Sequence, residues 1–178
     1  MGHYIALLRG VNVGGNRKLP MADLKRVLTA LGYADVRTLL ASGNFVFEGK
    51  KQSTAALERK LESDLAARMG LETDIMVRTP EEWEAAIAAN PFPAEAESHP
   101  SRLLLMALKS EPAAPARAAF ATYLERLAGP ERVIVHGREV FVFFPEGQAD
   151  SKLNLKALGS STGRNWNTVL KLRAMVAC

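Results

Sequence analysis

The order of strand and helix patterns in the first 78 residues constrains the fold more than any other feature. Short apolar runs typical of strands lie at residues 4–8, 36–40, 45–47 and 74–78. One amphipathic helix pattern begins at Pro20 and ends at Gly32, and a second is capped by Ser53 and ends at Gly70. The resulting order, β-α-β-β-α-β, is that of a ferredoxin-like half.

The rest of the sequence repeats part of this order about a hundred residues later. Thr79, Pro80 and Glu82 predict a helix start with a capping box and proline at the first helical position. A proline-rich connection, residues 90–101, follows this helix. Strands are then expected at 102–109, 133–136 and 140–144, and helices at 115–128, 153–158 and 166–176.

Length and composition agree with a globular protein built from these two parts. The chain has 178 residues, of which 48% are hydrophobic and 24% charged, so it can bury a full core. We therefore predict an α+β protein of two ferredoxin-like or related halves packed into one compact unit. Residues 1–79 form the βαββαβ half in this interpretation, and residues 80–178 form an αβαββαα half.

Cysteine and histidine usage bears on the compartment and on metal binding. The single cysteine is Cys178, so an internal disulfide is excluded, as expected in a reducing cytosol. The three histidines are far apart, and no metal motif is visible. No segment approaches the roughly 18 apolar residues of a membrane span. We expect a cytoplasmic protein with no metal, no cofactor and no membrane partner.

The segment Arg9–Lys18 (RGVNVGGNRK) is the main candidate for a binding site. It lies between an expected strand and the helix at Pro20, and it combines backbone N–H groups, small residues and three cationic side chains. Such a loop before a helix N-terminus can bind an anion. It is no P-loop, because Asn16 and Arg17 stand where Lys and Ser/Thr should follow, and its glycines do not fit the Rossmann spacing.

The expected strand order predicts which segments meet this loop. Strand three lies beside strand one in a ferredoxin-like half, so Asn44 should lie next to Arg9. The two loops would then share one end of the sheet. The candidate ligand-binding residues there are Arg9, Asn12, Gly14, Gly15, Asn16, Lys18, Ser42 and Asn44. A pair of loops that hydrogen-bond to each other, without a ligand, is the structural alternative.

The last helix supplies one more candidate. Trp166 is expected to be a buried anchor, with Asn165 as the helix cap. Arg164 lies just ahead of that helix, and its guanidinium can donate two hydrogen bonds to one anion. The preceding GSSTG, residues 159–163, matches G-x-S-x-G, but no Asp, Glu or His follows Ser161, which excludes a serine hydrolase of that type. We interpret this segment as a flexible connection between two helices.

Four motifs carry a resemblance to a known family: RGVNVGGNRKLPM at residues 9–21, ASGN at 41–44, NPF at 90–92 and TGRNWNTVLKL at 162–172. Together they resemble the "domain of unknown function 1697" family, essentially from end to end. The resemblance implies a compact bacterial protein of two α+β halves and brings no established activity.

Function must therefore be inferred from chemistry. The net charge of +4 and the pI near 9.4 favour anionic partners. We expect the loop to bind an anionic ligand: a phosphorylated metabolite, a nucleotide or a nucleic acid backbone. The alternatives are an enzyme acting on a phosphorylated or carboxylated small molecule, and a structural or protein-interaction module without a small ligand. The enzyme would lack a general base, because no histidine, carboxylate pair or thiol is visibly associated with the loop. The sequence leaves the oligomeric state open.

Overall fold

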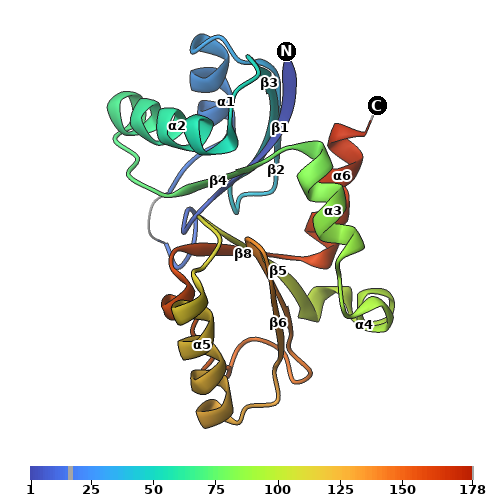
Figure 1. The fold of residues 1–178 in the computed structure, drawn as a ribbon. Coiled ribbons are helices and arrows are strands. Elements are labelled where there is room, and N and C mark those ends of the chain that lie inside the picture. Colours follow the sequence, from blue (N-terminus) through green and yellow to red (C-terminus); the bar gives the residue numbers. More distant parts are fainter. Residues whose placement is uncertain (16–17, 178) are drawn as a thin grey trace. The chain divides into compact units, whose positions relative to one another are not determined.

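A computed structural model describes residues 1–15 and 18–177 (Figure 1). The chain divides into two compact units: unit 1 comprises residues 1–85 and 172–178, and unit 2 comprises residues 86–171. The division predicted from the sequence lay between residues 79 and 80. Each unit contains one four-stranded antiparallel sheet, and six α-helices accompany them in the described part of the chain. The predicted α+β class in two halves is confirmed.

Unit 1 has the element order predicted for the first half. Its elements are β1 (Gly2–Leu8), α1 (Met21–Ala30), β2 (Ala34–Leu39), β3 (Asn44–Gly49), α2 (Thr54–Met69), β4 (Ile75–Arg78) and the start of α3 (Pro80–Ala88). The strands form a sheet of order β2-β3-β1-β4. Helices α1 and α2 lie on one side of this sheet (Figure 1). The term ferredoxin-like stays an interpretation of this order.

The ends of the helices in unit 1 follow local sequence signals. Ser53 caps α2 by accepting a hydrogen bond from the Ala56 N–H at 3.2 Å, and Gly70 ends the helix with a φ of +62°. Thr79 and Glu82 form the predicted capping box, since each backbone N–H donates to the other side chain, at 2.9 and 3.1 Å. These predictions are confirmed.

Helix α2 also covers the outer edge of strand β4. Glu58 and Glu62 lie one turn apart on α2, and their carboxylates accept hydrogen bonds from the N–H groups of Val77 and Ile75, both at 2.9 Å. The Glu58 carboxylate lies 3.8 Å from the guanidinium of Arg78, and both side chains are buried. These contacts satisfy N–H groups that an edge strand would otherwise leave without partners.

Unit 2 repeats the strand order of unit 1 with shorter connections. Its elements are the end of α3, α4 (Pro93–Ser98), β5 (Leu103–Leu108), α5 (Ala114–Leu127), β6 (Arg132–His136), β7 (Glu139–Phe143), β8 (Ser161–Asn165) and most of α6 (Trp166–Val176). The sheet order is β6-β7-β5-β8. The connection from first strand to first helix runs over residues 109–113 here, but over residues 9–20 in unit 1. The long glycine-bearing loop is therefore a feature of unit 1.

Three predictions for the second half are corrected. Helix α4 occupies the middle of the segment expected to be a proline-rich connection. The helix expected at residues 153–158 is a single 3₁₀ turn, Lys156–Leu158. The segment expected to be a flexible connection mostly belongs to β8, which pairs with β5 so that Arg164 lies opposite Leu105. The sequence of β8, STGRN, has no apolar residue, so only its pairing with β5 reveals it as a strand.

None of the helices in the described part of the chain is long and apolar enough to cross a membrane.

Candidate functional site

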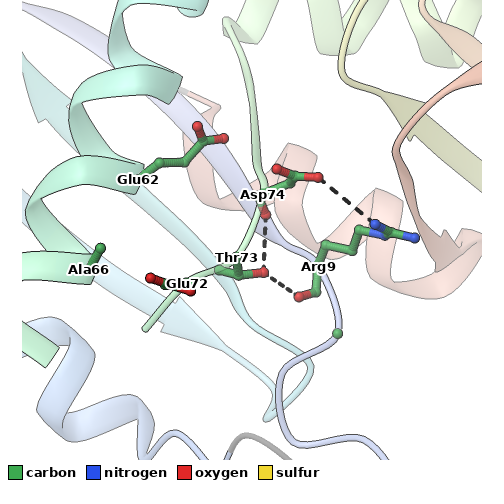
Figure 2. Close-up of a pocket in the computed structure, with 7 residues that line it drawn as sticks. Arg9, Glu62, Ala66, Glu72, Thr73 and Asp74 are labelled. Carbon is green, nitrogen blue, oxygen red and sulfur yellow. Dashed lines mark hydrogen bonds and ion pairs between the residues drawn. The ribbon is translucent and has the colours of Figure 1, made fainter. Parts of the chain in front are cut away.

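Arg9 follows β1 directly, and its backbone is fixed at both ends. The Arg9 N–H donates to the Asp74 carbonyl at 3.0 Å, and the Arg9 carbonyl accepts a hydrogen bond from the Thr73 hydroxyl. Its side chain is 55% exposed and extends toward the Asp74 carboxylate, with 3.9 Å between Nη1 and Oδ2 (Figure 2). The main chain of Arg9 is therefore anchored, whereas its guanidinium makes only a long, exposed ion pair with Asp74.

A cavity of about 760 Å³ opens beside Arg9, and we call it the Arg9 cavity. Its lining residues are Arg9, Gly10, Glu62, Ala66, Glu72, Thr73 and Asp74 (Figure 2). Among these described residues, one guanidinium and three carboxylates give a formal charge of −2 when every group is ionised. Among the residues that the structure describes, no three His, Cys, Asp or Glu side chains are arranged to hold a metal ion. These groups therefore combine one guanidinium, which can donate hydrogen bonds to an anion, with several carboxylates, which can accept a proton.

The expectation that no carboxylate pair is associated with the loop is wrong, since Glu72 and Asp74 line the cavity beside Arg9. Glu72 and Asp74 precede β4, and β4 pairs with β1 so that Ile75 lies opposite Leu8. The end of β1 and the start of β4 therefore lie together, which brings these carboxylates to Arg9. The signal was available in the sequence, because the predicted strand order also places strand four beside strand one.

The glycine loop, residues 9–18, meets the β2–β3 hairpin as the strand order predicts. The Leu8 N–H donates to the Gly43 carbonyl at 2.8 Å, and the Asn12 side chain donates to the Ala41 carbonyl at 2.6 Å. Gly43 has a φ of +87°, and a Cβ there would lie 2.5 Å from the Val11 side chain. Only glycine allows this close approach of the two segments.

Asn12 holds the glycine loop together. Its side-chain oxygen accepts from the Leu19 N–H at 2.6 Å, and its amide donates to the Leu19 carbonyl at 2.8 Å and to the Ala41 carbonyl. The hairpin is braced in the same way, since the buried Asn44 amide donates to the Leu39 carbonyl at 2.8 Å and to the Ser42 hydroxyl at 2.9 Å. Asn12, Ser42 and Asn44 thus shape the two loops, as in the structural alternative.

Gly14, Gly15 and Lys18 are exposed members of the loop. The two glycines have φ values of +58° and +77°, and a Cβ at either would meet no atom within 4 Å. Their backbone conformation, and not packing, therefore requires glycine. Asn16, the remaining candidate of this segment, lies outside the described residues, as does Arg17.

Lys18 borders a second cavity, of about 520 Å³, which we call the Lys18 cavity. It is lined by Lys18, Leu19, Pro20, Asp23, Met69, Gly70, Leu71 and Glu72. Pro20 is the N-cap residue of α1 and makes no side-chain hydrogen bond, so the first turn of α1 has no side-chain cap. Glu72 lines both cavities, so they adjoin on either side of this residue.

Arg164 belongs to unit 2, whereas the other described candidates belong to unit 1. Its guanidinium is buried and donates to the Thr162 hydroxyl and to the Gly163 carbonyl, both at 2.8 Å. Burial lowers the pKa of Arg164 to about 10. Both partners lie in β8, so these contacts stabilise the strand to which Arg164 itself belongs.

Comparisons with known proteins place the chain in a family. Residues 1–141, which include the glycine loop, the hairpin and the carboxylates, match the family described as "Protein of unknown function (DUF1697)". The solved structure of a conserved bacterial protein from Streptococcus pneumoniae is similar over 99% of both chains, with 25% sequence identity and a TM-score of 0.75. No curated protein matches this sequence. The chain therefore belongs to the DUF1697 family, which agrees with the resemblance of its motifs.

Proposed function

We propose that the protein binds an anionic ligand at the glycine loop and the adjoining N-terminus of α1. The observation that carries this proposal is the uncapped first turn of α1 beside Lys18. The N–H groups at a helix N-terminus carry partial positive charge, and an anion is a favourable partner for them. Lys18 adds a full positive charge at the border of the same cavity, beside the carboxylates of Asp23 and Glu72.

The glycine loop supports the proposal through its backbone. Gly14 and Gly15 lie in an exposed turn, and backbone N–H groups in a turn can bind an anion. The three hydrogen bonds of Asn12 fix the loop before any ligand arrives, so less conformational entropy is lost on binding. Asn12, Ser42 and Asn44 are therefore positioning residues in this proposal.

Among the ligand classes considered, a compact phosphorylated metabolite fits this site best. The adjoining Arg9 cavity carries three carboxylates, which repel a continuous polyanion such as a nucleic acid backbone. A single phosphate or pyrophosphate group is compact enough to bind where the two cavities adjoin at Glu72.

Catalysis on the same ligand is a second candidate function, favoured by the carboxylates beside Arg9. Asp74 and Glu72 offer a general base, and the Arg9 guanidinium can stabilise negative charge that develops in a reaction.

Replacing Lys18 by glutamate is expected to weaken the binding of inorganic pyrophosphate at least about tenfold, because the change reverses a charge at the site. Isothermal titration calorimetry at fixed ionic strength measures the affinity. Lys51→Glu is the matched control, since Lys51 is also exposed but follows β3 at the opposite end of the sheet. Phosphate release in the same samples would identify catalysis. No binding by the wild type, or equal loss in both variants, would contradict the proposed site.

A further inference from the structure

The ion pair between Arg9 and Asp74 points to a contact that limits binding at the proposed site. Among the described residues that line its cavity, Arg9 is the one cation, and its guanidinium lies within 4 Å of the Asp74 carboxylate. Both side chains are about half exposed, and the two charged atoms are 3.9 Å apart. An exposed pair of this length is weak, so a competing anion can replace one partner.

The surrounding backbone permits this exchange without a change of fold. The Arg9 main chain is held by the Asp74 carbonyl and the Thr73 hydroxyl, not by its own guanidinium. Figure 2 shows the guanidinium at the end of an extended side chain, on the side of the cavity next to the Asp74 carboxylate. The side chain can therefore change rotamer while β1 and β4 stay paired.

We infer that Asp74 is a built-in competitor for Arg9: its carboxylate and the anionic ligand bind the Arg9 guanidinium in turn, so that Asp74 lowers the affinity of the site. This inference rests on the proposed function. It goes beyond that function by assigning an autoinhibitory role to Asp74. The ligand must displace the Asp74 carboxylate before it can bind the Arg9 guanidinium. Glu62 and Glu72 add negative charge to the same cavity.

Asp74→Asn tests the inference because it removes the charge and keeps the shape. We expect the variant to bind inorganic pyrophosphate at least about fivefold more tightly than the wild type in calorimetric titrations. Asp35→Asn is the matched control. Asp35 also forms an exposed ion pair with an arginine, Arg37, at 3.0 Å, but it is the second residue of β2, at the other end of the sheet. Its affinity should equal that of the wild type.

A double variant shows whether the gain acts through Arg9. Arg9→Ala should abolish pyrophosphate binding with a nearly unchanged Tm, and adding Asp74→Asn should not restore it. Restored binding in the double variant would mean that Asp74 acts only by general repulsion, and the inference would be wrong. It would also be wrong if the wild type binds in a Lys18-dependent manner while Asp74→Asn changes nothing. Absence of binding in every variant would instead overturn the proposed function, and the inference with it.

Discussion

Replacing Trp166 by alanine is expected to lower the free energy of unfolding by about 3–5 kcal/mol. The side chain is only 4% exposed and belongs to the first residue of α6. The preceding Asn165 caps this helix, since its side-chain oxygen accepts from the Thr168 N–H at 3.1 Å. Removing the indole leaves a large cavity at a point where the backbone is fixed by the cap, so the surroundings cannot easily collapse into it.

Urea unfolding followed by circular dichroism measures this loss. Leu170→Ala is the control, because Leu170 lies on the same helix but is 40% exposed, and its loss should stay below about 1 kcal/mol. If Trp166→Ala also costs less than about 1 kcal/mol and the protein still folds, then Trp166 is not the anchor that its burial indicates.

Replacing Glu58 by alanine is expected to cost about 3–5 kcal/mol. The Glu58 carboxylate is 3% exposed, accepts from the Val77 N–H, and lies 3.8 Å from the guanidinium of Arg78, which is 1% exposed. The change removes a negative charge from beside a buried positive charge and takes the acceptor from an edge-strand N–H. Breaking a buried ion pair on one side is far more costly than losing an exposed one.

Two further variants separate the charge from the hydrogen bond. Glu58→Gln keeps an acceptor for Val77 but removes the charge, so most of the loss should remain. Glu62→Ala removes the equivalent acceptor for Ile75 from a less buried side chain, so about 1–2 kcal/mol is expected. Equal losses for Glu58→Ala and Glu62→Ala in urea unfolding would show that the buried charge pair adds nothing.

The elements that the sequence predicted are those with local signals. Ser53, Gly70 and the capping box of Thr79 and Glu82 act within one turn of a helix, and the structure has these ends where they were predicted. Strand β8 was missed because its residues are polar or small, and its extended form is imposed by β5, more than fifty residues away in the sequence. Long-range pairing of this kind leaves no periodic pattern to detect.

Some contacts of the candidate site can likewise be predicted from the sequence, and others cannot. The meeting of the glycine loop with the hairpin follows from strand order, and the hydrogen bond from the Asn12 amide to the Ala41 carbonyl confirms it. The same strand order also places Asp74 beside Arg9, because β4 pairs with β1. The three hydrogen bonds of Asn12 could not be predicted, because they depend on how two irregular loops fold against each other.

The central claim, an anion site at the glycine loop, is tested most directly by an NMR titration that observes each backbone amide. With inorganic pyrophosphate as the probe, the account predicts the largest chemical-shift changes at Gly14, Gly15, Met21 and Ala22, which belong to the loop and the first turn of α1. Shift changes that saturate there in the wild type, and that need a much higher pyrophosphate concentration in Lys18→Glu, would support the claim. No change at these amides, or larger changes around Arg164 in unit 2, would contradict it.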